Sequence, residues 1–68
     1  MSRYNYYVAR QEETRAEMRR CAILWRRFQR EGDWMLAETY LQMAREWRTL
    51  ANRYADIARA ECNVKFNI

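Results

Sequence analysis

The sequence predicts an all-α protein: an antiparallel two-helix hairpin, which we expect to form a four-helix bundle as a homodimer. Three observations support this prediction. The 68 residues contain no proline and a single glycine, Gly32; strong helix formers fill the stretches on both sides of it; and one stretch carries more apolar surface than one neighbour can cover. A chain of this length folds as one domain, which we assign to residues 1–68.

The first helix is expected over residues 4–30, which are rich in Glu, Arg, Ala, Met and Gln and contain no helix breaker. The turn follows at residues 31–33. Gly32 suits the left-handed position that ends many helices, and Asp33 suits the N-cap of the next helix. These two residues therefore predict both the end of one helix and the start of another.

The second helix is expected over residues 34–62, because no glycine or proline interrupts them. Residues 63–68 alternate between polar and apolar side chains, so we expect an extended tail or a frayed helix end there. A very short connection forces two long helices to lie antiparallel and side by side.

The second helix carries two apolar sets. The large residues follow alternating spacings of four and three, which form a heptad seam: Leu36, Tyr40, Met43, Trp47, Leu50, Tyr54 and Ile57. The second set lies one position further along and is mostly small, with an interruption at Arg48: Ala37, Leu41, Ala44, Ala51, Ala55, Ala58 and Cys62. Together the sets cover about 200° of the helix, whereas a stripe of about 100° suffices against one neighbour.

The surplus apolar surface predicts self-association. Two hairpins could form a four-helix bundle, with the large seam in one contact and the small residues allowing close approach in the other. We assign the self-association or partner face to the small set: Ala37, Leu41, Ala44, Ala51, Ala55 and Ala58. The alternative is a monomer in which residues 63–68 fold back over the exposed surface.

The residues around the turn include a recognisable set: Leu24, Phe28, Gly32, Asp33, Trp34, Ala37, Leu41 and Ala44. This set resembles a tetratricopeptide repeat, a helical hairpin of 34 residues. Cys21, Trp25 and Thr49 depart from the repeat, which has tryptophan, a small residue and proline at those places, and no second copy is visible. We interpret the resemblance as convergence on helical-hairpin packing, so it implies no peptide-binding groove.

Basic side chains outnumber acidic ones by 13 to 9, and residues 1–31 carry the whole net charge of +4. On the helical wheel, six arginines of the first helix form a basic stripe: Arg15, Arg19, Arg20, Arg26, Arg27 and Arg30. Such a stripe could meet an acidic protein surface, neutralise the phosphates of a nucleic acid, or remain a solvated face. Near the hairpin ends, Tyr4, Tyr7 and Trp34 are candidate aromatic anchors for a partner.

Enzymatic chemistry has little support in the sequence. Histidine is absent, and no glycine-rich phosphate loop or nucleophile elbow is present. Cys21 and Cys62 are too far apart for a zinc-ligand motif. Glu12, Glu13 and Glu17 are expected to pair with neighbouring arginines of the stripe rather than to form a catalytic carboxylate cluster. We expect no enzymatic activity, no cofactor, no metal and no small-molecule substrate.

The expected location is the cytoplasm. The first residues contain no apolar run of the signal-peptide kind, and no segment approaches the roughly 20 apolar residues that span a bilayer. Two unpaired cysteines on helical faces agree with a reducing compartment.

These observations predict a small helical interaction protein that acts by stoichiometric binding to a larger, acidic-surfaced protein, as a regulator or inhibitor. The alternative is a basic helical dimer that binds structured RNA or duplex DNA through the arginines of the first helix.

Overall fold

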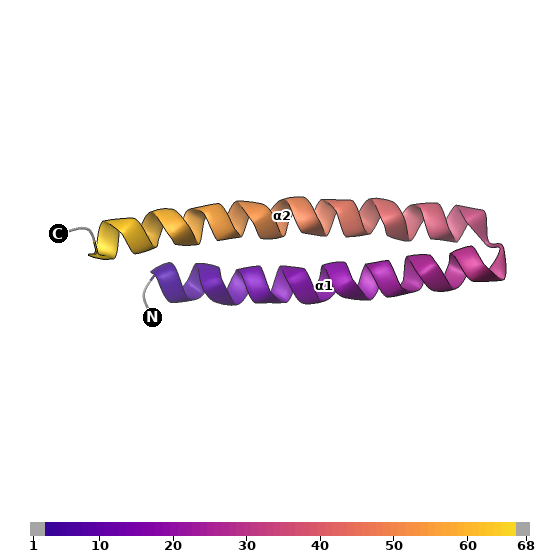
Figure 1. Ribbon diagram of the computed structural model, residues 1–68, viewed down its shortest axis with the longest axis horizontal. Helices are drawn as coiled ribbons and strands as arrows, with labels where there is room; N and C mark the ends of the chain where they lie inside the picture. The colour runs from indigo at the N-terminus through magenta and orange to yellow at the C-terminus, as the bar shows by residue number, and fades with distance from the viewer. Residues whose placement is uncertain (1–2, 67–68) are drawn as a thin grey trace.

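Two α-helices, α1 (Arg3–Glu31) and α2 (Trp34–Phe66), make up the described chain. The computed structural model describes residues 3–66, with side chains described for residues 3–63. The helices are antiparallel and lie side by side, so the start of α1 and the end of α2 are at the same end of the molecule (Figure 1). The predicted all-α helical hairpin is confirmed.

The end of α2 differs from the prediction. The helix is expected to end at about residue 62, with an extended tail or a frayed helix end over residues 63–68, but it continues through Phe66. Neither glycine nor proline follows residue 62, so nothing stops the helix there. Residues 63–66 therefore extend the helix and do not fold back over the hairpin; residues 67–68 lie outside the described part of the chain.

The turn has the geometry that its two residues predict. Gly32 adopts a positive φ of 81°. Its N–H donates to the carbonyl of Gln29 at 3.2 Å, and the N–H of Asp33 donates to the carbonyl of Phe28 at 2.9 Å, which together form a Schellman C-cap. The Asp33 carboxylate then accepts a hydrogen bond from the backbone N–H of Leu36 at 3.2 Å, as an N-cap does.

Replacing Gly32 by alanine is expected to destabilise the hairpin by about 1 kcal/mol, because a Cβ disfavours this left-handed conformation. A Cβ at this position would have nothing within 4 Å, so the cost is conformational and not steric. Gly32→Asn is the matched control, since asparagine tolerates positive φ and should cost less. Thermal unfolding followed by circular dichroism measures the stability of both variants. If Gly32→Ala were as stable as the original chain, Gly32 would have no role as a helix C-cap.

The two helices meet along a line of small residues. The buried positions recur every seventh residue along each helix: Thr14, Cys21, Ala37, Ala44, Ala51 and Ala58. Thr14 and Ala51 stand equally far from the turn along their helices, and so do Cys21 and Ala44. The pairing of small side chains lets the two backbones approach closely.

This packing corrects the predicted self-association face. Four of its six members, the alanines at 37, 44, 51 and 58, are at most 8% exposed and lie in the contact between the two helices of one chain. They are therefore not available to a second copy. Leu41 and Ala55, at the edge of the contact, are half-buried.

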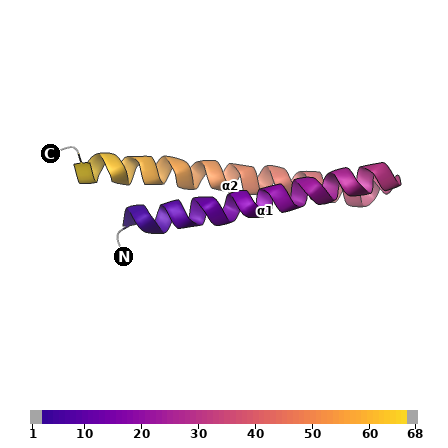
Figure 2. The ribbon, with the colours of Figure 1, turned by 60° about the horizontal axis from the view of Figure 1, so that its bottom comes forward.

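The hairpin is long and narrow, with dimensions of 55 × 16 × 12 Å. In the described chain, each helix packs against the other helix and has no further helical neighbour. In Figure 2, α1 passes in front of α2 near the turn while the two are separate at the other end, so the helices are inclined to one another. A seven-residue repeat of contacts is typical of such inclined helices.

The buried hydroxyl of Thr14 has its hydrogen-bonding needs met within α1. It donates to the carbonyls of Arg10 and Gln11, each at 2.9 Å. Among the described side chains, no buried polar atom lacks a hydrogen-bond partner. A threonine can therefore occupy the core without a desolvation penalty of the kind that an unpaired polar group would carry.

Candidate interaction surfaces

The large heptad seam of α2 lies beside the line of buried alanines, along one edge of the contact with α1. We call this surface the apolar face; it consists of Leu36, Tyr40, Met43, Trp47, Leu50, Tyr54 and Ile57. Leu36 and Met43 are 41% and 38% exposed, and the other five are half-buried. The side chains of α1 therefore cover this face only in part.

Aromatic rings of α1 cover two of the tyrosines on the apolar face. Phe28 stacks on Tyr40, with ring centroids 5.5 Å apart and planes inclined by 10°. At the other end, Tyr7 lies against Tyr54 with a centroid distance of 6.1 Å. These contacts fix the edge of the face nearest α1 and contribute about 0.5–1.5 kcal/mol each beyond simple burial.

Arg10 of α1 also lies at the edge of the apolar face nearest α1, beside Tyr54. Its guanidinium lies 5.5 Å from the centroid of the Tyr54 ring and forms an ion pair with Glu13. A side-chain hydrogen bond with Tyr54 is the main influence that raises the pKa of Arg10 above its ordinary value, with a smaller contribution from Glu13. Arg10 therefore has an acidic partner on its own helix.

The other ion pairs are also local to one helix. Arg20 pairs with Glu17 at 2.8 Å, and Arg27 pairs with Glu31 at 3.2 Å. On α2, Arg59 pairs with Asp56 at 3.6 Å. All are exposed pairs of helical spacing, which contribute a few tenths of a kcal/mol each.

These ion pairs involve only two of the six arginines of the basic stripe predicted from the sequence. Arg20 and Arg27 are paired with glutamates, whereas Arg15, Arg19, Arg26 and Arg30 have no ion pair with any described residue. Of the three glutamates expected to neutralise the stripe, Glu17 pairs with Arg20 as expected and Glu13 pairs with Arg10 instead. Four exposed arginines of the basic stripe are therefore left without an ion-pair partner in the described chain.

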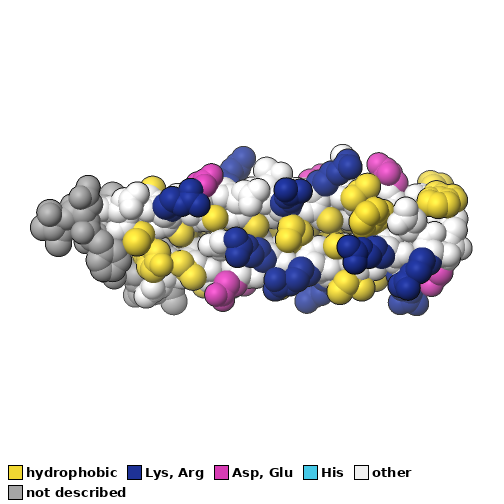
Figure 3. Space-filling view, viewed as in Figure 1, with side chains coloured by type: hydrophobic (Ala, Val, Ile, Leu, Met, Phe, Trp, Pro, Cys, Tyr) yellow, Lys and Arg dark blue, Asp and Glu magenta, His cyan; other side chains and the backbone are white. Residues whose placement is uncertain are grey.

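A groove on the face opposite the apolar face brings arginines of both helices together. We call it the arginine-bordered groove; it has a volume of about 280 Å³ and is lined by Met18, Arg19, Ala22, Trp25, Leu41, Ala44, Arg45 and Arg48. Figure 3 shows this face, with basic side chains of both helices on either side of a line of hydrophobic ones. None of the lining residues is acidic.

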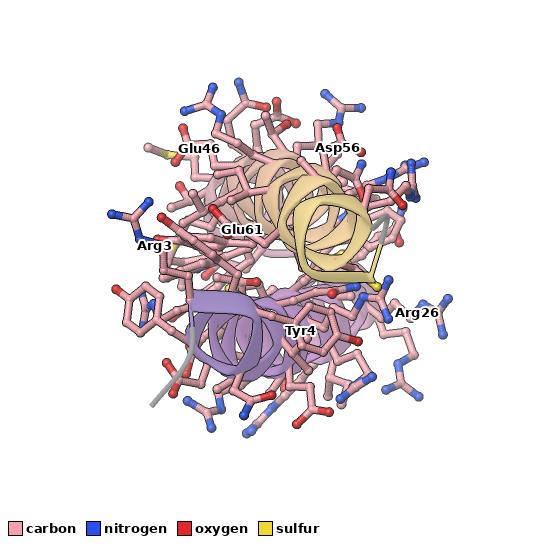
Figure 4. The ribbon with its side chains drawn as sticks, turned by 90° about the vertical axis from the view of Figure 1, so that its left-hand side faces the viewer. Arg3, Tyr4, Arg26, Glu46, Asp56 and Glu61 are labelled. Atoms are coloured by element: carbon pink, nitrogen blue, oxygen red, sulfur yellow. The ribbon has the colours of Figure 1, made fainter. Side chains whose placement is uncertain are left out.

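The end-on view in Figure 4 separates the two faces. Arg26 points to the right, the side shown in Figure 3, whereas Arg3 points to the left. Glu61, which continues the spacing of the large seam after Ile57, also lies on the left. Arg26, which has no ion pair with a described residue, therefore lies on the side of the hairpin opposite the apolar face.

Arg45 and Arg48 were not predicted as site residues, because the basic stripe predicted from the sequence lies on the first helix alone. The available signal was the interruption of the small-residue set of α2 by Arg48, which places a charge at the edge of the helix contact. Of the predicted stripe, Arg19 lines the groove, and Arg26 and Arg30 line a neighbouring hollow that shares Trp25.

The three candidate aromatic anchors have different surroundings. Tyr7 packs on Tyr54 and on the edge of Tyr6, with a centroid distance of 5.1 Å to the latter, so it contributes to the hairpin itself. Tyr4 is half-buried beside the end of α2. Trp34 is 66% exposed at the turn end and is the most accessible of the three.

The two cysteines are free thiols, with Cys21 buried and Cys62 half-buried. Burial raises the pKa of the Cys21 thiol above its ordinary value of 9.0. Because the folded form holds this proton more tightly than the unfolded form, the stability associated with Cys21 is complete below pH 9.0 and declines at higher pH.

We expect Cys62 to react first with a disulfide reagent at pH 8, and Cys21 to react at least about tenfold more slowly because the helices must separate to expose it. The single variants Cys21→Ser and Cys62→Ser assign the two rates by absorbance of the released thiolate. A faster reaction at Cys21 would contradict its burial between the helices.

No protein-family model, curated protein or solved structure matches the chain. The similarity to a tetratricopeptide repeat therefore rests on the residues named above alone. Within residues 3–66, neither helix contains a stretch apolar enough to cross a membrane. No group of three or more His, Cys, Asp or Glu side chains in the same range could hold a metal ion.

Proposed function

We propose that this chain is a small, non-enzymatic interaction protein: a homodimeric four-helix bundle that binds a larger, acidic protein stoichiometrically, as a regulator or inhibitor. The observation that carries the proposal is the partly uncovered apolar face of α2. Since the alanines of α2 pack within the hairpin, the large side chains beside them remain available to a second copy.

The exposed area supports a dimer. A compact monomer of 8.5 kDa exposes about 4,700 Å², whereas this hairpin exposes 5514 Å². The excess, on the order of 800 Å², is close to the area of about 800 Å² that each partner contributes to a stable interface of standard size. Pairing two hairpins would return the exposed area of each chain to the ordinary range.

Charge favours the apolar face over the opposite face for self-association. A two-fold dimer brings identical surfaces together, so a surface of unpaired positive charge repels its own copy. On the side of the apolar face, Arg10, Arg20 and Arg27 each pair with a glutamate, whereas Arg19 and Arg26 on the opposite side have no ion pair with a described residue. The dimer would therefore keep the unpaired arginines on its outer surface.

Sedimentation equilibrium at low micromolar concentration tests the dimer. We expect a species of about twice the chain mass of 8.5 kDa, with helical circular dichroism at the same concentration. A well-folded monomer under these conditions would exclude self-association, although it would leave binding to a different protein open to a pull-down from the native host.

A second candidate function is supported by the unpaired arginines of both helices, which could neutralise phosphates of duplex DNA or structured RNA. A salt titration of binding to random duplex DNA and RNA separates the two functions. Binding that is submillimolar at low ionic strength and falls steeply with added salt would favour nucleic acid. Absence of such binding, together with recovery of a specific protein partner, would favour the proposed function.

A further inference from the structure

We infer that the arginine-bordered groove is a docking site for an acidic amphipathic helix of a partner protein. This inference rests on the proposed function, since it names the surface and the partner chemistry of an interaction protein. The groove lies on the opposite side of the hairpin from the apolar face, so a dimer would leave it open.

The floor of the groove is apolar. It is formed by Met18, Ala22 and Trp25 from α1 and by Leu41 and Ala44 from α2, all of them half-buried except the buried alanine of α2. From Met18 to Trp25 the α1 side of the groove extends over two helical turns, about 10 Å. A volume of about 280 Å³ lies just below the roughly 300–1,000 Å³ of small-molecule sites, and suits a few protruding side chains of another helix.

The borders of the groove are basic on both sides. Arg19 comes from α1, and Arg45 and Arg48 come from α2; all three are exposed and none forms an ion pair within the described chain. A ligand with an apolar ridge between two rows of carboxylates would match both the floor and the borders. An amphipathic helix with acidic flanks has this arrangement, and arginine binds carboxylates in a bidentate geometry.

The positive surface continues beyond the groove. A neighbouring hollow shares Trp25 and is lined by Arg26, Gln29 and Arg30, again without an acidic residue. By contrast, the hollow on the other side of the hairpin, beneath Trp47, is lined by two glutamates as well as an arginine. A bound acidic helix could therefore extend toward the turn along α1 while still meeting positive charge.

Other anionic partners fit the groove less well. A nucleic acid backbone would satisfy the arginines but has no apolar ridge for the floor, and the half-buried Trp25 does not present a free ring on which bases could stack. An anionic membrane is flat and would not enter a groove between two helices. The combination of an apolar floor with basic borders thus favours a protein helix.

The test uses the full chain, labelled with nitrogen-15, and two synthetic helical peptides. The first has leucines at i, i+3 and i+7 on one face and glutamates on both flanks; the second has glutamine in place of every glutamate. We expect the glutamate peptide to shift the backbone amides of residues 18–25 and 41–48 in NMR spectra, and to bind at least about tenfold more tightly than the glutamine peptide.

Variants then test the residues. The double variant Arg45→Gln, Arg48→Gln should weaken binding of the glutamate peptide at least about tenfold, because it removes one border of the groove. The matched control is Arg53→Gln, which changes an exposed arginine of the same helix away from the groove and should leave the affinity unchanged. All three positions are exposed, so thermal unfolding should confirm that both variants fold.

Several outcomes would overturn the inference: no amide shifts with millimolar peptide, equal affinity for the two peptides, or the same shifts produced more readily by duplex DNA or by phosphatidylserine vesicles. Shifts confined to the apolar face would also overturn it, although the proposed interaction function would survive. Sedimentation of the peptide-free sample reports the dimer independently, so failure of the groove and failure of the dimer can be told apart.

Discussion

Replacing Ala51 by leucine is expected to destabilise the hairpin by about 1–3 kcal/mol. This is the largest loss of stability that we expect from any small-to-large substitution in this chain. Ala51 is 1% exposed, and it stands level with Thr14, which is also 1% exposed. A larger side chain has no space between them, so the helices must separate or one side chain must leave its preferred rotamer.

The matched control for this change is Ala60→Leu. Ala60 is on the same helix and is exposed, so the substitution makes the same chemical change without touching α1. A surface substitution of this kind should change stability by no more than about 0.5 kcal/mol.

Thermal unfolding at a fixed protein concentration measures both changes. In a domain of this size, 1 kcal/mol corresponds to a shift of about 4–8 °C in Tm. If the two leucine variants unfolded at the same temperature, the alanines could not form the close contact between the helices.

Replacing Met43 by glutamate is expected to convert the proposed dimer to a folded monomer. Met43 is on the apolar face with 38% of its surface exposed, so the variant should not disturb the contact between α1 and α2. In a two-fold dimer the substitution buries two carboxylates, one from each copy, in an apolar contact. We expect the dissociation constant to rise by at least about a hundredfold, since desolvated charges at an interface cost several kcal/mol.

The control for this change is Met35→Glu, the same substitution on the same helix. Met35 is 85% exposed and lies outside the apolar face, so its variant should dimerise like the original chain. A dilution series by sedimentation equilibrium, with circular dichroism of each sample, distinguishes loss of the dimer from loss of the fold. Equal dissociation constants for the two glutamate variants would place any dimer contact elsewhere.

The local parts of the fold could be predicted because their causes are local. Backbone hydrogen bonds of a helix connect residues four apart, and the turn depends on one residue that tolerates positive φ and one that caps the next helix. Gly32 and Asp33 were therefore assigned correctly from the sequence. The predicted end of α2 at residue 62 was wrong because a short alternation of polar and apolar residues does not stop a helix, and neither glycine nor proline follows.

The candidate surfaces depend on contacts between the helices, which the sequence left open. Its pattern showed two apolar sets on the second helix but did not show which one would face the first helix. The buried Thr14 and Cys21 of α1 are small, so the alanines of α2 can approach them closely, and the large seam is left at the edge. The arginine-bordered groove arises only when Arg19 meets Arg45 and Arg48 across that contact.

By itself, then, the sequence determined two helices, their antiparallel arrangement and an apolar surface too wide for one neighbour. These properties follow from residue spacing and turn chemistry within short stretches of the chain. The tertiary structure decided which apolar set is buried, which arginines remain unpaired and where the two helices create a groove, because each of these depends on how one helix is rotated and aligned against the other.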